Sequence, residues 1–244
     1  MLPNFAYFRE IQQRLAVQTP QSSPVLWTAA AHEAAETLGS AEPFYAFLWP
    51  GSYALCKLLI EKPHIAAGKA VLDFGAGCGA AGVAALKAGA AHVTLNDIDT
   101  AALSACSENL HQNMNSSACA EWHQRVTLCA SDLLVSEVCA GGPPPLSLCD
   151  VLLCGDVFYD EDFARGVQAM LVRALQSGVD VYVADPGRPA LPWAARDSLS
   201  GKAAGGGPQG PCTWEHIGTV QLPDNVQCVS NGHSECHVWR LLLR

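Results

Sequence analysis

The stretch VLDFGAGCGAAG, residues 71–82, has the residue types of a ligand-binding loop. It satisfies the permissive Gly-x-Gly-x-x-Gly/Ala form of the dinucleotide-binding motif, whose glycines let the backbone approach a ligand closely. Asp73 stands two positions before Gly75, where a carboxylate would repel a pyrophosphate but attract the ammonium or sulfonium of S-adenosylmethionine. A local role, in which Asp73 caps the turn, is the alternative. We therefore expect Asp73, Gly75 and Gly77 to bind S-adenosylmethionine.

Two further carboxylates follow the next apolar runs. Asp97 lies 22 residues beyond Gly75, where it could accept hydrogen bonds from both hydroxyls of an adenosine ribose. Asp132, in LCASDLL, is placed to meet the adenine amino group, although an exposed loop acid would look the same. Asp99 is better explained as a helix N-cap. Asp97 thus indicates an adenosine site without choosing between a dinucleotide and S-adenosylmethionine.

Short apolar runs alternate with amphipathic stretches along the chain. This alternation is typical of parallel βαβ units, and hence of a doubly wound α/β sheet. The tail suggests two final antiparallel strands, which gives a Rossmann-like seven-stranded sheet, mostly parallel with an antiparallel C-terminal strand. The expected strands are 70–74, 92–96, 126–130, 150–154, 179–184, 213–222 and 236–243, and the expected helices are 52–60, 79–88, 100–113 and 163–176.

The length and composition favour a single domain over 1–244. Of the 244 residues, 50% are hydrophobic, enough for one full core. The Gly- and Pro-rich stretches at 139–149 and 200–211 cannot sustain helix or strand, so we expect surface loops there, the second of them flexible. We expect a monomer.

The formal charge of −9 argues against a nucleic-acid partner, because such binding depends on Lys and Arg neutralising phosphates. No apolar run is long enough for a membrane span. His233, Cys236 and His237 could suggest a metal site, but no second ligand pair is visible, so we expect one or two of these side chains to pack inward from a C-terminal strand and expect no metal. The N-terminal twenty residues have two arginines and no long apolar core, so neither a secretory signal nor a mitochondrial presequence is evident.

Several segments occur in the order seen in one enzyme family. PFYAFLWPGSYAL, VLDFGAGCGAAGVAALKAGA, LNDID, GDVFYDED and VADPGRP resemble the lysine methyltransferases that modify the β subunit of electron transfer flavoprotein, which belong to the seven-stranded, S-adenosylmethionine-dependent class. The resemblance covers 43–192 and leaves 1–42 as an N-terminal extension. It implies a protein-lysine N-methyltransferase whose partner is that β subunit. It also implies a location in the mitochondrial matrix if the source is eukaryotic, or in the cytoplasm if it is bacterial.

The resemblance also implies roles for four residues outside the glycine loop. Trp49 and Gly51, in the Trp-Pro-Gly segment, would lie beside the cofactor, and Asp156 and Tyr159, in the Asp-x-x-Tyr segment, would lie at the substrate lysine. A lysine with a pKa near 10.4 is mostly protonated at neutral pH, so the site must bind the ammonium and orient the free amine after a proton leaves. We expect Asp156 to orient the amine, and Tyr159 to complete the pocket if this segment makes a helical turn. The alternative is that Asp156 caps the helix that follows.

Other functions stay open at this point. The same cofactor half would serve a methyltransferase acting on another protein, at lysine or arginine, or on a small amine. An NAD-dependent oxidoreductase is disfavoured by Asp73, and a catalytically inactive cofactor-binding protein would carry the same motifs.

Overall fold

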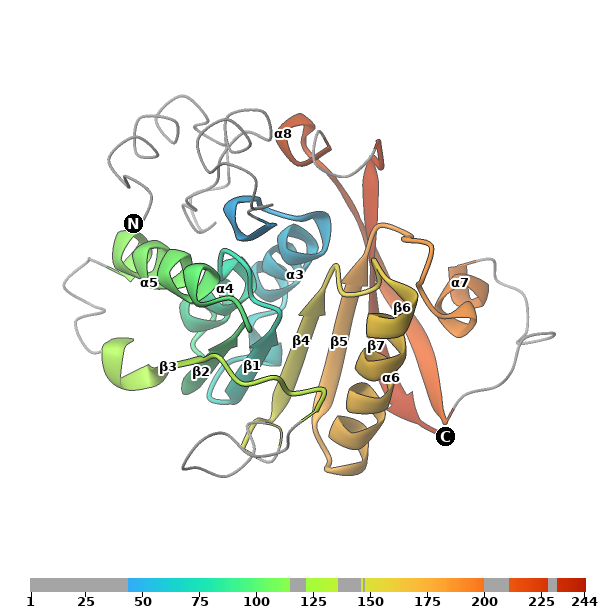
Figure 1. Cartoon of the computed structure of the whole chain (residues 1–244), viewed down its shortest axis with the longest axis horizontal. Helices are drawn as coiled ribbons and strands as arrows, with labels where there is room; N and C mark the ends of the chain where they lie inside the picture. The colour runs from blue at the N-terminus through green and yellow to red at the C-terminus, as the bar shows by residue number, and fades with distance from the viewer. Residues whose placement is uncertain (1–43, 115–121, 136–145, 147, 200–210, 228–231) are drawn as a thin grey trace.

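The computed structural model describes residues 44–114, 122–135, 146, 148–199, 211–227 and 232–244 (Figure 1). The N-terminal extension 1–42, most of the Gly/Pro-rich stretch 139–149 and residues 200–210 of the second such stretch lie outside the described residues. The flexibility expected for 200–211 therefore stays a prediction. Within the described ranges, no helix combines the length and apolar character needed to cross a membrane.

The described chain builds a seven-stranded sheet in the order β3-β2-β1-β4-β5-β7-β6. Neighbours from β3 to β5 are parallel, whereas β7 is antiparallel to both β5 and β6. The predicted doubly wound fold with an antiparallel C-terminal strand is confirmed. The strands are β1 (Ala70–Phe74), β2 (His92–Asn96), β3 (Val126–Cys129), β4 (Val151–Gly155), β5 (Asp180–Asp185), β6 (Cys212–Gln221) and β7 (Glu235–Leu243).

Helices cover both faces of the sheet (Figure 1). One apolar cluster joins the sheet to α3, α4, α5 and α8, and a second joins its other face to α6 and α7. The α-helices are α3 (Pro50–Glu61), α4 (Ala80–Lys87), α5 (Thr100–Met114), α6 (Glu161–Gln176), α7 (Trp193–Leu199) and α8 (Asp224–Gln227), and the 3-10 helices are η1 (Phe44–Ala46), η2 (Pro63–Ile65) and η4 (Trp122–Arg125).

The start of α3 lies directly on the ends of β4 and β5. A Cβ added to Gly51 would lie 2.5 Å from the Ala184 carbonyl oxygen and 2.6 Å from the Asp156 backbone nitrogen. A Cβ on Gly155 would lie 2.8 Å from the Ser52 nitrogen. Since neither backbone can move aside cheaply, glycine at both positions permits this contact.

The predicted strands 70–74 and 92–96 match β1 and β2 residue for residue, whereas several helix ends differ. Helix α3 begins at Pro50 rather than Ser52, because proline suits the first helical turn, where its missing N–H costs no bond. Helix α6 begins at Glu161 because Asp160 caps it, accepting the Phe163 N–H at 2.8 Å. Helices α7 and α8 were not predicted, since they are short and carry little periodicity.

The seating of α3 on β4 can be tested with Gly155→Ala. The added methyl group should separate α3 from the strand end and lower the free energy of unfolding by about 1–3 kcal/mol, the usual cost of overpacking. Gly218→Ala is the matched control, because a Cβ at Gly218 meets nothing within 4 Å. Urea unfolding of both variants measures the difference. Equal stability of the two would mean that α3 is not seated on β4 as described.

Candidate active site

The loop between β1 and α4 has the backbone that its glycines predict. Gly75, Gly77 and Gly79 adopt positive φ angles of 63°, 53° and 76°, a region that side chains disfavour. The loop is tied to the end of β2, because the Ala76 N–H donates to the Asn96 carbonyl at 2.9 Å. The glycine loop therefore lies between the carboxyl ends of β1 and β2, where ligands bind in sheets of this kind.

Asp73 is buried beneath this loop, with 3% of its surface exposed. Its Oδ2 atom accepts the Gly82 N–H at 2.8 Å, so one oxygen stabilises the first turn of α4, which is close to the local role considered above. Burial raises the pKa of Asp73 to about 7, the Gly82 N–H opposes this rise, and the charge of Asp97 adds to it. A nearby cation would oppose this rise, because it would stabilise the ionised carboxylate.

Asp97 holds the glycine loop from the end of β2. Its Oδ2 accepts the Gly77 N–H and its Oδ1 accepts the Asp99 N–H, both at 3.0 Å. Burial raises the pKa of Asp97, the two N–H donors oppose the rise, and the charge of Asp99 adds to it. Asp99 caps α5 as predicted, because its carboxylate accepts the Ala101 N–H at 2.8 Å. Asp73 and Asp97 thus lie on two sides of the same loop.

Asp132 is less closely tied to this site. It is exposed, and its Oδ1 accepts the Leu134 N–H at 2.9 Å. Its contact with an adenine stays a prediction. Sequence reasoning missed Asn96, which is buried and donates through Nδ2 to the carbonyls of Cys129 (3.0 Å) and Ser131 (2.9 Å). A polar residue ending an apolar strand was the available signal, since such a side chain needs buried partners.

Asp156 follows β4 and lies beneath the start of α3. Among the described residues it is the non-glycine residue with a positive φ, 58°. One carboxylate oxygen accepts the Gly51 N–H, and Oδ1 accepts Nη2 (2.7 Å) and Nε (3.2 Å) of Arg188. Burial raises the pKa of Asp156, while Arg188 and the N–H groups of Gly51 and Ser52 oppose the rise. Asp156 therefore binds the N-terminus of α3 and not α6, which Asp160 caps.

Tyr159 is displayed to solvent, with 61% of its surface exposed. Its ring stacks on Phe163 with centroids 5.1 Å apart. The segment from Asp156 to Tyr159 does not make the helical turn on which the shared role of these residues depended, so the two side chains do not share a helix face. Partial burial raises the pKa of Tyr159, the charges of Asp160 and Asp97 add to the rise, and Arg188 opposes it. Tyr159 thus lies within electrostatic range of Asp97, which is expected to bind the ribose, and of Arg188, which binds Asp156.

Trp49 contacts Arg188, a residue that sequence reasoning did not single out. The guanidinium carbon of Arg188 lies 5.4 Å from the centroid of the half-buried Trp49 ring, and Trp49 Nε1 donates to the Phe44 carbonyl at 2.7 Å. The guanidinium therefore lies between Trp49 and Asp156, and the Asp-Pro-Gly-Arg segment shapes this site through its arginine. A lone arginine in a Pro/Gly turn gives no sequence signal for such a contact.

The acidic residues of the loop fit a cationic, sugar-bearing ligand. The charge that acts on Asp73 is that of Asp97, and the charge that acts on Asp97 is that of Asp99. A pyrophosphate would meet unfavourable carboxylates here, whereas an ammonium or sulfonium would be stabilised. Elsewhere, the described residues hold no cluster of three or more His, Cys, Asp or Glu that could bind a metal, and Cys236 packs in the core as expected.

Comparison with known proteins shows which family this chain is similar to. The family model for ribosomal protein L11 methyltransferase (PrmA) matches residues 52–141. The electron transfer flavoprotein beta subunit lysine methyltransferase of Danio rerio is 32% identical over 201 residues, covering 82% of this chain and 66% of that protein. The Homo sapiens protein of the same name is 33% identical over 162 residues, covering 64% of this chain and 54% of that protein. This chain belongs to that methyltransferase family.

The match to these relatives covers only part of their length. The chain spans between about half and two thirds of the length of these relatives. Among solved structures, a Pyrococcus horikoshii protein assigned as an RNA methyltransferase superposes with a TM-score of 0.56 over 98% of both chains, at 16% identity. At this identity, that likeness shows the fold alone. The roles of the individual site residues stay predictions.

The role of Asp97 can be tested by replacing it with alanine. Loss of hydrogen bonds to a charged acceptor costs about 1.5–3 kcal/mol, so the dissociation constant for S-adenosylhomocysteine should rise about ten- to a hundredfold. Asp99→Ala is the matched control, since it removes the cap of α5 but leaves the Asp97 carboxylate in place. Isothermal titration measures both. An unchanged constant in Asp97→Ala would assign this carboxylate to the loop alone.

Proposed function

We propose that this chain is an S-adenosylmethionine-dependent protein-lysine N-methyltransferase that modifies lysines of the electron transfer flavoprotein beta subunit. The observation that carries the reaction class is the pair of carboxylates, Asp73 and Asp97, that flanks the glycine loop. The names of the relatives support the acceptor, because the Danio rerio and Homo sapiens proteins are described as methyltransferases of that subunit.

A second candidate is methyl transfer to another protein, at lysine or arginine, or to a small amine. The L11 methyltransferase model supports this candidate, because its match over 52–141 covers the glycine loop and Asp97 but ends before Asp156 and Tyr159. The glycine loop and Asp97, which are expected to bind the cofactor, would thus serve several acceptors. The residues that follow β4 and β5 must then select among these acceptors.

The methyl donor supplies an electrophilic methyl group on a sulfonium, which an amine attacks in line. The chain's own task is to hold the donor and to align a neutral amine with the methyl group, since positioning accounts for much of the rate of such reactions. The acceptor ammonium loses its proton to water before transfer. Tyr159 is exposed and fixed by its stack on Phe163, so its ring and hydroxyl are available to the incoming lysine.

Asp156 has a more restricted part in this proposal. Arg188 binds one of its oxygens and the Gly51 N–H binds the other, so an amine would have to share an oxygen already in use. Direct orientation of the amine by Asp156 stays a prediction, and its observed contacts make it an anchor for the start of α3.

The compartment that we propose depends on the acceptor. The proposed compartment is the mitochondrial matrix for a eukaryotic source and the cytoplasm for a bacterial one, because the enzyme must meet its substrate. The monomeric state and the absence of a nucleic-acid partner stay predictions that rest on composition and charge.

The proposed reaction can be tested by mass spectrometry of recombinant electron transfer flavoprotein after incubation with the chain and S-adenosylmethionine. We expect mass increments of methyl groups on lysine of the beta subunit. Tyr159→Phe should lower the rate by about tenfold or more, because the hydroxyl that helps to position the amine is lost while the stack on Phe163 remains.

Tyr182→Phe serves as the control, since Tyr182 is buried within β5 and packs in the core. It should retain its rate per folded molecule. Methyl groups found on arginine or on a small amine instead would favour the second candidate. Lysine methylation at an undiminished rate in Tyr159→Phe would remove Tyr159 from the acceptor site.

A further inference from the structure

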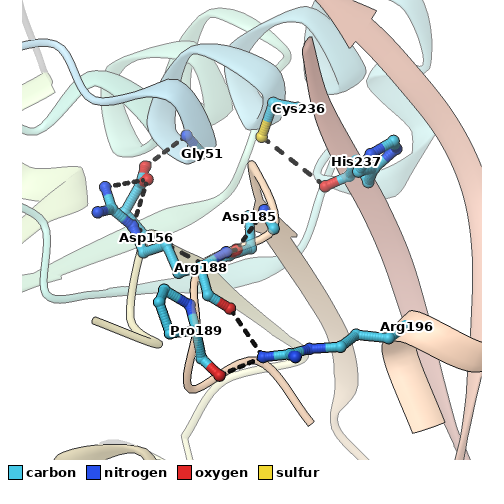
Figure 2. A network of polar contacts seen from close by, with 9 residues as sticks. Gly51, Asp156, Asp185, Arg188, Pro189, Arg196, Cys236 and His237 are labelled. Atoms are coloured by element: carbon cyan, nitrogen blue, oxygen red, sulfur yellow. Dashed lines mark hydrogen bonds and ion pairs between the residues drawn. The ribbon is translucent and has the colours of Figure 1, made fainter. Parts of the chain in front are cut away.

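The turn after β5 is built to aim Arg188 at the start of α3. The Asp185 carboxylate is fully buried, and its Oδ1 accepts the N–H groups of Gly187 and Arg188, both at 2.7 Å. From α7, Arg196 donates to the carbonyls of Arg188 (3.2 Å) and Pro189. Figure 2 shows these contacts converging on the turn. The backbone of Arg188 is thus fixed from two sides.

The side chain of Arg188 then joins two segments that are far apart in the sequence. Its guanidinium bonds to Asp156 Oδ1 through two nitrogens and lies 5.4 Å from the centroid of the Trp49 ring. The side chain is only 15% exposed, and that of Asp156 is 7% exposed. Because so little of this ion pair is exposed, solvent screens its charges weakly. Its attraction is therefore stronger than that of a surface pair, and its geometry is more restricted.

We propose that Arg188 is a positioning residue of the methyl-transfer site, which clamps the Trp49–Gly51 segment to the segment that runs from Asp156 to Tyr159. The first segment is expected beside the cofactor and the second beside the acceptor lysine, so the clamp sets the distance between donor and acceptor. The inference rests on the proposed function and deepens it. Arg188 itself touches neither reactant in this account.

Arginine suits this position better than lysine. Its planar guanidinium can bond to a carboxylate through two nitrogens and stack on an indole at the same time, whereas an ammonium is a compact point charge. The neighbouring Asp185 adds a further reason for a permanent cation, because its Oδ2 is buried without a hydrogen-bond partner. Burial raises the pKa of Asp185 to about 7, and the charge of Asp156 adds to this rise. Arg188 opposes the rise in the pKa of both Asp156 and Asp185, so its removal would leave two buried carboxyl groups without that cation.

The experiment compares Arg188→Met with Arg240→Met in the full chain. Misplacement of a reacting group by a small distance can cost about a hundredfold in rate, so we expect kcat to fall about 10- to 100-fold in Arg188→Met. Trp49 is expected beside the cofactor, but the glycine loop and Asp97 are untouched, so the dissociation constant for S-adenosylhomocysteine should rise less than kcat falls, by about threefold or less, about 0.7 kcal/mol. Arg240 pairs with Asp180 at 2.7 Å at the opposite end of β5, and its variant should keep both values.

Two further variants separate positioning from general destabilisation. Arg188→Lys should recover part of kcat, because it retains the charge but loses the two-nitrogen contact. Asp156→Asn combined with Arg188→Met should be no slower than the worse single variant, because residues that act through one contact are not additive. A kcat within about twofold of wild type in Arg188→Met, an equal loss in Arg240→Met, or additive effects in the double variant would each overturn the proposal.

A measurement without substrate keeps the clamp separate from the proposed function. Amide hydrogen exchange at Gly51 and Ser52, whose N–H groups bind Asp156, should be about tenfold or more faster in Arg188→Met and unchanged in Arg240→Met, since local opening controls exchange. If the wild-type chain methylates no protein, the proposed function fails and this exchange result still decides the clamp. Unchanged exchange in Arg188→Met would overturn the clamp whatever the activity.

Discussion

The contact between the N-terminus of α3 and the Asp156 carboxylate is the interaction on which the rest of the site depends. The helix has no side-chain cap of its own, since Trp49 makes no such bond and Pro50 has no N–H. A carboxylate from the end of β4 supplies that cap across 105 residues of sequence and is favourably placed in the helix dipole. The close approach leaves no room for a side chain at positions 51 and 155. The left-handed backbone of Asp156 and its bond to Arg188 occur at the same contact.

A second constraint is the sign of the charge at the glycine loop. The fold and the three left-handed glycines would suit a dinucleotide as well as a methyl donor. We expect Asp73 to decide between them, because a pyrophosphate at the loop would lie close to its carboxylate, whereas Asp97 would serve either ligand. The raised pKa values of both groups reflect burial that a cationic ligand would offset. Fold and loop therefore provide the shape of the site, and we predict that the carboxylate of Asp73 provides its selectivity.

Much of the fold could be predicted because its signals are local. The buried strands β1 and β2 are short apolar runs bounded by glycine and aspartate, and Asp99 has the type and position of an N-cap. The cofactor carboxylates were also accessible to sequence reasoning, since they occupy fixed offsets from the glycines. Their contact with a ligand is still a prediction, but the structure brings Asp73, Gly77 and Asp97 together at the ends of β1 and β2.

The part of the site expected to bind the acceptor lysine, which includes Asp156, Tyr159 and Arg188, could not be predicted in the same way. Its contacts join residues that are distant in sequence. Nothing near Asp156 in sequence shows that Arg188 and Gly51 occupy its carboxylate. A helical turn from Asp156 to Tyr159 does not form, because α6 begins only after its N-cap, Asp160. The central claim is that the carboxylate-lined loop selects a cationic methyl donor. Isothermal titration of wild type and Asp73→Asn with S-adenosylmethionine and with NAD tests it most directly. The account predicts saturable binding of S-adenosylmethionine that weakens in the variant, and no tight binding of NAD; tight NAD binding without any response to S-adenosylmethionine would contradict it.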